Sequence, residues 1–303
     1  MDEEAAVLGA VAVHRRHCCG DRVIPMTAFG RAARMVRRGG CDHEMSLTDG
    51  RDQQHRPVAL VTGAGRSAGI AASVVVTLAR TGWDVGFTYW TPYDARMPWG
   101  ADPEAMTQLS GQAAEHGART VAVEANLADP HTTADIFEAV ERELGSVSAL
   151  VLAHCESVKS GLLDTSIESF DRHFAVNTRA SWLLIREYAR RFRGSHGTGR
   201  IVSLTSDATV GNLPYGASKG ALDRITLAAA QELAHLGVTA NAIDPGPTDT
   251  GWMTAEIKDA VLRATPLGRL GRPRDCANLV AFLCSPDGGW INGQLLRSDG
   301  GIS

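Results

Sequence analysis

The sequence lacks the features that mark nucleic-acid-binding and secreted proteins. Its 303 residues carry a net charge of -4, so there is no basic excess to bind a phosphate backbone. Its six cysteines, three of them crowded at Cys18, Cys19 and Cys41, do not form the evenly spaced framework of a secreted domain. We therefore expect a reducing, cytoplasmic setting and no nucleic-acid partner.

Long apolar runs are also missing from the N-terminal part of the chain. The run from Ala5 to Val13 is too short to span a bilayer. It follows three acids, Asp2, Glu3 and Glu4, where a signal peptide would carry basic residues. We expect neither export nor a membrane partner.

Residues 1–56 differ in composition from the rest of the chain. They hold nine Arg and no Lys against eight acids, with no clean period of a helix or a strand. We interpret them as a disordered N-terminal extension of a domain that covers residues 57–303. A short basic amphipathic helix at 26–38 and a true start at Met45 are alternatives, and a chain that begins at Met45 or later should keep its fold and activity. Zinc-type residues are present, but their spacing matches no familiar finger, so we expect no metal: His14, His17, Cys18, Cys19, Cys41 and His43.

The character of the sequence changes at Pro57. A buried-type strand at 58–61 runs into a glycine-rich turn at 62–69, and a helical run follows at 71–80. In this order of elements, glycines let backbone N–H groups approach a pyrophosphate at the helix N-terminus, whereas a glycine cluster alone is more often a plain turn. We expect the cofactor to contact Thr62, Gly63, Gly65, Arg66, Gly69 and Ile70.

The second strand, Trp83 to Tyr89, ends without an acid. A carboxylate at that point would accept a hydrogen bond from a ribose 2′-hydroxyl and repel a 2′-phosphate. Its absence, together with Arg66 in the glycine turn, favours NADP(H) over NAD(H). Tyr89 and Trp90 could stack on the adenine or simply pack, and the aromatic, Pro-punctuated stretch 90–100 is interpreted as a loop.

Strands and helices alternate along the rest of the chain. We expect strands at 120–124, 148–154, 200–206 and 238–243, with helices at 135–144, 169–193 and from 214 onward. This alternation predicts a single doubly wound, Rossmann-type α/β domain, in which helices cover both faces of a parallel sheet and ligands bind at the carboxyl ends of the strands. Asn126 and Leu127, in the turn after the strand at 120–124, are assigned to the cofactor site.

Tyr215 and Lys219 lie one turn apart at the start of the helix that follows Pro214. Asn212 is a candidate cap for this helix. An ammonium beside a phenol favours the phenolate, so we expect the pKa of Tyr215 to be lowered toward the working pH. The two residues would then form an acid/base unit, although this spacing also occurs by chance on many helices.

The order and spacing of these motifs over residues 57–302 resemble the short-chain dehydrogenase/reductase family, in its 3-oxoacyl-[acyl-carrier-protein] reductase-like branch. The resemblance is carried by Phe174-Ala-Val-Asn177, the Tyr-x-x-x-Lys pair, Asn241-Ala-Ile-Asp-Pro-Gly246 and the closing stretch Asn292 to Gly301. It implies that Tyr215 is the general acid and that Lys219 lowers its pKa and holds the nicotinamide ribose. Ser206 would orient the substrate carbonyl, and Asn177 would hold a proton-relay water. The loop over the nicotinamide and phosphates would comprise Pro245, Gly246, Thr248 and Thr250.

Three features depart from the family pattern. The glycine turn has two extra residues, so that Gly69 and Ala71 stand at its last two glycines. Leu152-Ala-His-Cys155 replaces the usual Asn-Asn-Ala-Gly, so His154 is either a polar group near the cofactor or a buried His satisfied by backbone. Only eight residues separate Ser206 from Tyr215, so Thr205 or Asp207 could stand nearer the substrate.

The resemblance implies an NADP(H)-dependent oxidoreductase that interconverts a carbonyl and a secondary alcohol, with a 3-oxoacyl thioester as the leading substrate. A reductase of a steroid, sugar or secondary-metabolite ketone is the first alternative. A non-catalytic NADP-binding sensor or scaffold is the second, and the intact Tyr215/Lys219 pair argues against it. The candidate pocket residues His154, Trp252 and Met253 do not define the substrate. The resemblance also implies a homo-oligomer, a dimer or tetramer, that pairs through the helices at 169–193 and 214–236.

Overall fold

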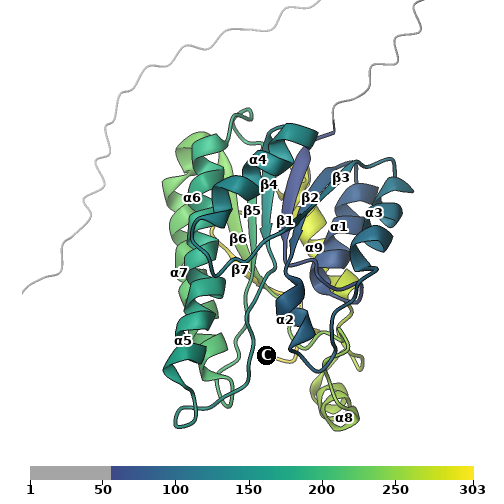
Figure 1. The fold of residues 1–303 in the computed structure, drawn as a ribbon, viewed down its shortest axis with the longest axis vertical. Coiled ribbons are helices and arrows are strands. Elements are labelled where there is room, and N and C mark those ends of the chain that lie inside the picture. The colour runs from purple at the N-terminus through teal and green to yellow at the C-terminus, as the bar shows by residue number, and fades with distance from the viewer. Residues whose placement is uncertain (1–55) are drawn as a thin grey trace, which may run out of the picture. The chain divides into compact units, whose positions relative to one another are not determined.

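A parallel sheet forms the centre of the computed structural model, which describes residues 56–303 (Figure 1). Within these residues the sheet has seven strands in the order β3-β2-β1-β4-β5-β6-β7. The expectations for residues 1–55, namely the extension, the amphipathic helix, the start at Met45 and the His/Cys cluster, concern residues outside this range. The strands are β1 (Val58–Thr62), β2 (Asp84–Tyr89), β3 (Thr120–Glu124), β4 (Val147–Leu152), β5 (Gly199–Leu204), β6 (Val238–Asp244) and β7 (Leu295–Arg297).

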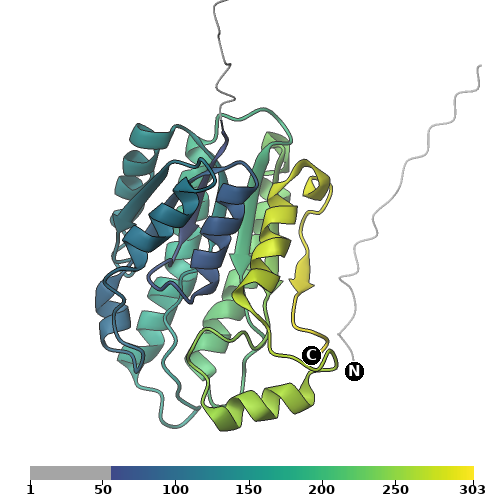
Figure 2. The same ribbon diagram turned by 90° about the vertical axis from the view of Figure 1, so that its right-hand side faces the viewer.

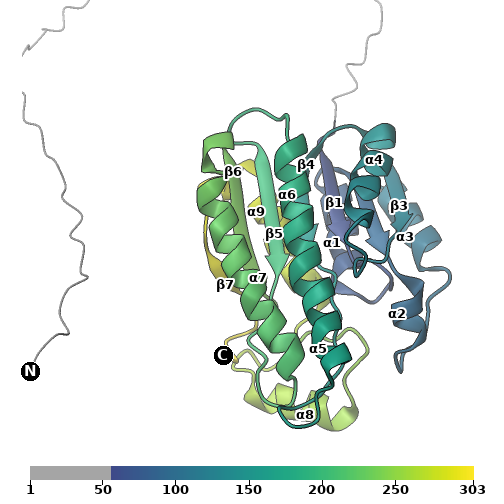
Figure 3. The same cartoon turned by 60° about the vertical axis from the view of Figure 1, so that its left-hand side comes forward.

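Helices cover both faces of the sheet, as the alternation of elements predicted. Figures 1 and 2 show one layer formed by α1 (Ile70–Arg80), α3 (Ala105–Ala114) and α9 (Pro273–Cys284). The opposite layer contains α4 (Thr132–Leu144), α6 (Ser181–Arg191) and α7 (Leu213–Glu232), which Figure 3 brings forward. The domain is therefore a doubly wound, Rossmann-type α/β fold.

The side chains of β1 show how the sequence produces this three-layer core. Val58 and Leu60 belong to the apolar cluster under α4, α6 and α7, whereas Ala59 and Val61 belong to the cluster under α1 and α9. Successive residues of a strand point to opposite faces, so a continuous apolar run is what a strand buried on both faces requires.

The stretch 90–100 is not purely a loop, so that prediction was wrong. It contains a short helix, α2 (Thr91–Ala95), with a proline in its first turn. Proline fixes its own φ near the helical value and lacks only an N–H that the first turn leaves unbonded anyway. Pro92 therefore starts a helix here, and the helix buries Asp94.

The helix predicted at 169–193 is interrupted. It consists of α5 (Ile167–His173), a π-helical segment η1 (Phe174–Ala180) and α6. Asn177 lies in η1 and is fully buried. A π-helical turn inserts an extra residue per turn, which re-aims side chains and is common at functional sites.

The start of α7 agrees with the prediction in position but not in its cap. Asn212 stands at the N-cap, yet its side chain makes no capping hydrogen bond and its Oδ1 has no partner among the described residues. The helix start is fixed instead by close packing. A Cβ at Gly216 would collide with the carbonyl of Ala208, so glycine lets the first turn of α7 lie directly against the loop after β5.

The remaining short elements lie between or beyond these helices. They are η2 (Ala234–Leu236), α8 (Ala255–Ala264) and η3 (Pro286–Gly288). Of the helices in residues 56–303, none combines the length and hydropathy needed to cross a membrane. The same residues hold no cluster of three or more metal-ligating side chains.

Candidate active site

The glycine turn after β1 packs tightly against the segment that follows β4. Gly63 has φ of 83°, and a Cβ there would lie 2.5 Å from Cα of His154. Only glycine tolerates both this backbone conformation and this approach. Thr62 joins the same two segments, because its Oγ1 accepts a hydrogen bond from the N–H of Ala153 at 3.1 Å.

The start of α1 is suited to an anionic ligand. Gly69 is its N-cap and offers no side-chain cap, and the first turn holds no acid. The first N–H groups of the helix that begins at Ile70 are therefore not satisfied by a side chain, and they carry the positive end of the helix dipole. These features fit the pyrophosphate of a dinucleotide cofactor.

A segment after β2, residues 91–102, lies against this turn, and we refer to it as the strap. Asp94 in α2 is buried, accepts a hydrogen bond from Trp99 Nε1 at 3.0 Å, and places its other oxygen where a Cβ on Gly65 would be. Asp102 accepts hydrogen bonds from the backbone N–H and the hydroxyl of Ser67. These two acids could not be found from the sequence pattern, because they lie beyond the end of β2 and reach the glycine turn only through the fold.

Arg66 joins the strap to the loop after β6. Its guanidinium lies 4.4 Å from the centre of the Trp99 ring and donates to the carbonyl of Thr250 at 2.6 Å. Burial raises the pKa of the Asp94 carboxyl, and the hydrogen bond from Trp99 and the charge of Arg66 oppose that effect. The glycine turn, the strap and the loop after β6 therefore meet at Arg66.

The strap is also tied to the exit of β4. Glu156 is buried and pairs with Arg96 of the strap at 2.5 Å and with Arg172 of α5 at 3.6 Å. The phenol of Tyr93 hydrogen-bonds the backbone of Ser157. The strap thus spans from the glycine turn to the β4 exit, across the carboxyl ends of the strands, where α2 lies in Figure 1.

Tyr215, Ser206 and Lys219 come together at the end of β5. The Ser206 side chain lies close enough to the Tyr215 phenol to lower the pKa of that phenol. Lys219 Nζ donates to the carbonyl of Leu204 at 2.7 Å and lies 5.7 Å from the centre of the Tyr215 ring. Of the three candidates near the substrate, Ser206 is the one beside Tyr215; Thr205 is buried against the backbone of Lys219 and Asp207 is exposed.

The expected lowering of the Tyr215 pKa is wrong for this structure. Burial raises that pKa above its ordinary value, with smaller contributions of the same sign from Cys155 and Asp244, while the Ser206 hydrogen bond opposes them. Burial also lowers the pKa of Lys219. Desolvation disfavours the charged form of both groups, and it outweighs the effect of a neighbour one turn away.

Asn177 holds the β4 exit in place. Its Oδ1 accepts from the N–H of Glu156 at 2.7 Å, and its Nδ2 donates to the carbonyl of Glu156 at 2.9 Å and to Ser218 Oγ at 2.8 Å. The amide group is thereby fully engaged with the backbone after β4 and with α7, one residue before Lys219. No sequence motif indicates the contact between Asn177 and Ser218.

His154 is a buried structural residue. Its Nδ1 lies 2.6 Å from Thr62 Oγ1 and its Nε2 lies 3.0 Å from the carbonyl of Val176. Burial, with a smaller effect of Lys219, lowers its pKa to about 3, so the ring is neutral at pH 7. Of the two interpretations of His154, the buried His satisfied by neighbours is the one confirmed. The next residue, Cys155, is a free thiol whose pKa burial raises.

The loop after β6 faces the glycine turn through the Arg66 contact. Gly246 has φ of 58° and lies against the side chain of Asp299, so a Cβ there would collide. Thr248 Oγ1 donates to the carbonyl of Pro245 at 3.2 Å, and the Thr248 carbonyl accepts from Trp252 Nε1 at 3.2 Å. Met253 is buried, whereas Trp252 is exposed.

Asn126 and Leu127 lie in the turn after β3. Ala125 donates its N–H to the carbonyl of Tyr89 at 2.9 Å, which brings the ends of β2 and β3 together. Asn126 Oδ1 accepts from the N–H of Ala128 at 3.1 Å and so shapes the turn, and Leu127 is buried. The predicted cofactor residues therefore line one edge of the sheet from β3 to β6.

Comparison with known proteins identifies the family. The family model described as "Enoyl-(Acyl carrier protein) reductase" matches residues 63–303. A "Short-chain type dehydrogenase/reductase" of Picea abies is 34% identical over 255 residues, which is 80% of this chain and 91% of the relative. The chain belongs to the short-chain dehydrogenase/reductase family. It is accordingly an NAD(P)-dependent oxidoreductase that acts on an alcohol or carbonyl group.

Other relatives in this family have similar lengths. "Uncharacterized oxidoreductase YjdA" of Bacillus subtilis is 37% identical over 250 residues, covering 81% of this chain and 96% of the relative. Among solved structures, a "blue fluorescent protein from metagenomic library in complex with NADPH" is 31% identical with a TM-score of 0.73, covering 82% of this chain and 98% of that one. A short-chain dehydrogenase of Burkholderia cenocepacia, solved "in complex with NADP", is 32% identical with a TM-score of 0.72, covering 81% and 97%.

Proposed function

We propose that this protein is an NADP(H)-dependent reductase that converts a carbonyl to a secondary alcohol, with Tyr215 as the proton donor. The observation that carries this proposal is the meeting of Tyr215, Ser206 and Lys219 at the end of β5, with the buried ammonium 5.7 Å from the centre of the Tyr215 ring. The phenol is protonated at neutral pH, as a general acid in the reductive direction must be, and its raised pKa makes it a weaker acid than a free phenol. The bound nicotinamide would supply the hydride.

Each of the four residues has a distinct role in this proposal. Ser206 holds the substrate oxygen beside the Tyr215 hydroxyl, and Tyr215 gives that oxygen its proton. The ammonium of Lys219 stabilises the negative charge that the phenol acquires as its proton leaves, and it is expected to hold the nicotinamide ribose. Asn177 positions the β4 exit and α7, and the relay water that the family resemblance implies would lie beside it.

A preference for NADP(H) over NAD(H) is part of the same proposal. It rests on Arg66, whose guanidinium can pair with a 2′-phosphate, and on the absence of an acid at the end of β2. Two acids contact the glycine turn: burial raises the pKa of Asp94 and Trp99 donates to one of its oxygens, and Asp102 is engaged by Ser67. Two Arabidopsis thaliana relatives described as NADPH-dependent aldehyde reductases, one as "-like protein", support the preference.

We propose a 3-oxoacyl thioester as the first substrate class, from the family resemblance. A ketone of secondary metabolism is the second candidate. Relatives described as "Versicolorin reductase 1" and "Hydroxynaphthalene reductase-like protein Arp2" support it, as does the exposed Trp252, which offers an aromatic surface in the loop after β6. A cytoplasmic location remains a prediction.

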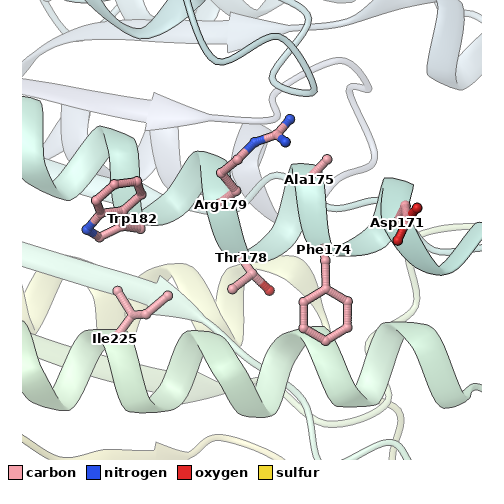
Figure 4. A pocket seen from close by; sticks show the side chains of 7 residues that line it. All are labelled: Asp171, Phe174, Ala175, Thr178, Arg179, Trp182 and Ile225. Carbon is pink, nitrogen blue, oxygen red and sulfur yellow. The ribbon is translucent and has the colours of Figure 1, made fainter.

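We further propose that the protein forms a homo-oligomer through α5, η1, α6 and α7. A surface groove lies between these helices, and Figure 4 shows the Phe174 ring and Ile225 on its facing walls. Trp182 lies at one end of the groove and is 46% exposed, so a second copy would bury a large aromatic side chain. The other residues lining the groove are Asp171, Ala175, Thr178 and Arg179. Light scattering should give a dimeric or tetrameric mass, and Trp182→Glu should lower it; a monomeric wild-type mass would contradict the proposal.

The reaction is tested by following NADPH oxidation against a panel of carbonyl compounds. The panel should contain acetoacetyl thioesters, aldehydes, sugars, steroids and aromatic ketones, each with NADPH and with NADH. Turnover with at least one of these compounds supports the proposal. NADPH binding without turnover of any compound in either direction would favour a sensor or scaffold instead.

A further inference from the structure

The mouth of the proposed site carries an ammonium group that the proposed reaction leaves unused. The chain has three lysines, Lys159, Lys219 and Lys258. Lys219 is buried beneath Tyr215, and Lys258 pairs with Asp249 at 2.8 Å. Lys159 is exposed, and across residues 56–303 it has no carboxylate partner within ion-pair distance. Neither folding nor the transfer of hydride and proton accounts for it.

Lys159 lies in the loop after β4, which contacts the loop after β6 and the start of α7. Its Nζ is 5.1 Å from the centre of the Trp252 ring, and Trp252 is fixed by its Nε1 hydrogen bond to the carbonyl of Thr248. The carbonyl of the next residue, Ser160, accepts from the N–H of Leu213 at 3.0 Å, two residues before Tyr215. The ammonium is thus held at the carboxyl end of the sheet, where Figure 3 shows the start of α7 above α8.

The positive charge of this region is not cancelled locally. Glu156 is the nearest acid in the sequence, and it already pairs with two arginines, Arg96 and Arg172. Asp164, in the same loop as Lys159, accepts a hydrogen bond from the N–H of Gly161 at 2.6 Å and makes no ion pair with Lys159. An ammonium that rests on one ring face keeps N–H donors for another partner, because it has three of them.

We propose that Lys159, held over Trp252, binds an anionic group at the end of the substrate remote from the reacting carbonyl. The inference rests on the proposed function and narrows its substrate class to anionic carbonyl compounds. The anion is either a carboxylate of the substrate itself or a phosphate of a thioester carrier, since both offer the oxygens that an ammonium binds. The loop that carries Lys159 exposes Leu162 and Leu163, and the loop after β5 exposes Val210; these side chains fit an apolar chain between the anion and the carbonyl.

Matched substrate pairs test the assignment and distinguish the two sources of the anion. Acetoacetyl-CoA is compared with the acetoacetyl thioester of N-acetylcysteamine, which carries the same acyl group without phosphates. A keto acid with an apolar chain is compared with its methyl ester. KM and kcat for each are measured with saturating NADPH in the wild type, in Lys159→Gln and in Lys159→Arg. Arg142→Gln, which removes one exposed positive charge from α4, is the control.

In the wild type, the KM of the anionic member of at least one pair should be about five-fold lower than the KM of the neutral member. A difference of this size is what one partly exposed ion pair contributes. In Lys159→Gln the KM of the anionic member should rise to that of the neutral member. Lys159→Arg should retain most of the difference in KM, and Arg142→Gln should leave that difference unchanged. The ratio should shrink as salt is added, because salt screens exposed charges. A ratio confined to the CoA pair assigns a phosphate, and one confined to the keto acid pair assigns a carboxylate.

Two negative outcomes are distinguishable. If both members of each pair turn over with the same KM ratio in the wild type and in Lys159→Gln, the inference is overturned and the proposed function stands. If no member turns over, the proposed function fails, and keto acid binding to the NADPH complex is then followed by tryptophan fluorescence. Binding that Lys159→Gln weakens would still support the anion site, and binding that is absent or unchanged would overturn it.

Discussion

Lys219 Nζ lies 5.7 Å from the centre of the Tyr215 ring and donates to the carbonyl of Leu204 at 2.7 Å, so the ammonium is held beneath the phenol by the last residue of β5. Both groups are desolvated, and burial moves their pKa values in opposite directions: that of Tyr215 rises and that of Lys219 falls. Lys219 is therefore the group expected to lose its proton first as the pH increases.

The pH dependence of carbonyl reduction should report that loss. We predict that kcat is level near neutral pH and falls on the alkaline side, with a midpoint below the pKa of a free lysine, while Tyr215 is still protonated. Lys219→Arg should move this fall to higher pH because a guanidinium does not deprotonate. A profile in Lys219→Arg that overlays the wild type would show that another group titrates.

Replacing Lys219 by Ala should harm both binding and turnover. The substitution removes the charge beneath the phenol and the donor expected to hold the nicotinamide ribose, so NADPH affinity and kcat should fall together. Lys219→Arg should retain only part of the NADPH affinity and part of kcat, because the reach and shape of the donor change. NADPH titration by fluorescence and steady-state kinetics would separate the two effects, and unaltered NADPH affinity in Lys219→Ala would refute the ribose contact.

Arg66 should discriminate between the two cofactors. Arg66→Ala is expected to weaken NADPH binding by at least about ten-fold, because it removes one charge-assisted pair with the 2′-phosphate. NADH has no 2′-phosphate, so its binding should be nearly unchanged. Arg66 also contacts Trp99 and the Thr250 carbonyl, so equal losses for NADPH and NADH would mean that it only joins the strap to the loop after β6. Arg142→Ala on α4 controls for the change in net charge.

We predict that the pairing of Glu156 with Arg96 stabilises the fold more than its pairing with Arg172 does. Glu156 is buried, and its distance to Arg96 is 2.5 Å against 3.6 Å to Arg172. Glu156→Gln should lower the free energy of unfolding by about 1–3 kcal/mol, because the carboxylate is buried while both arginines reach solvent. Chemical denaturation should show a larger loss for Arg96→Gln than for Arg172→Gln. The reverse order would mean that the pairing with α5 matters more.

His154 should make stability depend on pH. Its folded pKa of about 3 lies below the ordinary value near 6.5, so between these values the unfolded state binds the extra proton. The contribution of neutral His154 to the free energy of unfolding is therefore complete above pH 6.5 and is lost as the pH falls toward 3. The free energy of unfolding then changes by up to about 1.4 kcal/mol per pH unit. Denaturation at several pH values should show a shallower slope in His154→Asn, and equal slopes would mean that His154 is accessible to protons.

Local pattern was enough to predict the layers of the fold. Continuous apolar runs such as Val58–Val61 predicted strands buried on both faces, and the structure places them in a seven-stranded parallel sheet. The short helix at Thr91–Ala95 was missed because Pro92 and the nearby aromatics are typical of loops, and only packing against the glycine turn distinguishes the two. The π-helical turn around Asn177 has no sequence period of its own.

The placement of Tyr215 beside Lys219 was predicted but the pKa shifts of both groups were not, and the roles assigned to the candidate site residues stay predictions. The spacing of Tyr215 and Lys219 correctly placed both on one face of α7, yet it could not reveal the burial that raises the pKa of Tyr215. Asp94 and Asp102 reach the glycine turn only through the tertiary fold, so an argument from the end of β2 could not find them. His154 was undecided in the sequence because its partners, Thr62 and Val176, are far along the chain.

The most direct measurement of the central claim compares wild type with Tyr215→Phe in NADPH oxidation and in NADPH binding. The substitution removes one hydroxyl and keeps the ring that packs above Lys219, so turnover should fall by about 10²–10⁴-fold while NADPH affinity stays within about two-fold. His154 is buried and neutral at pH 7, so it would be too weak an acid to take the place of the phenol. Turnover by Tyr215→Phe within a few-fold of wild type would contradict the assignment of Tyr215 as the proton donor.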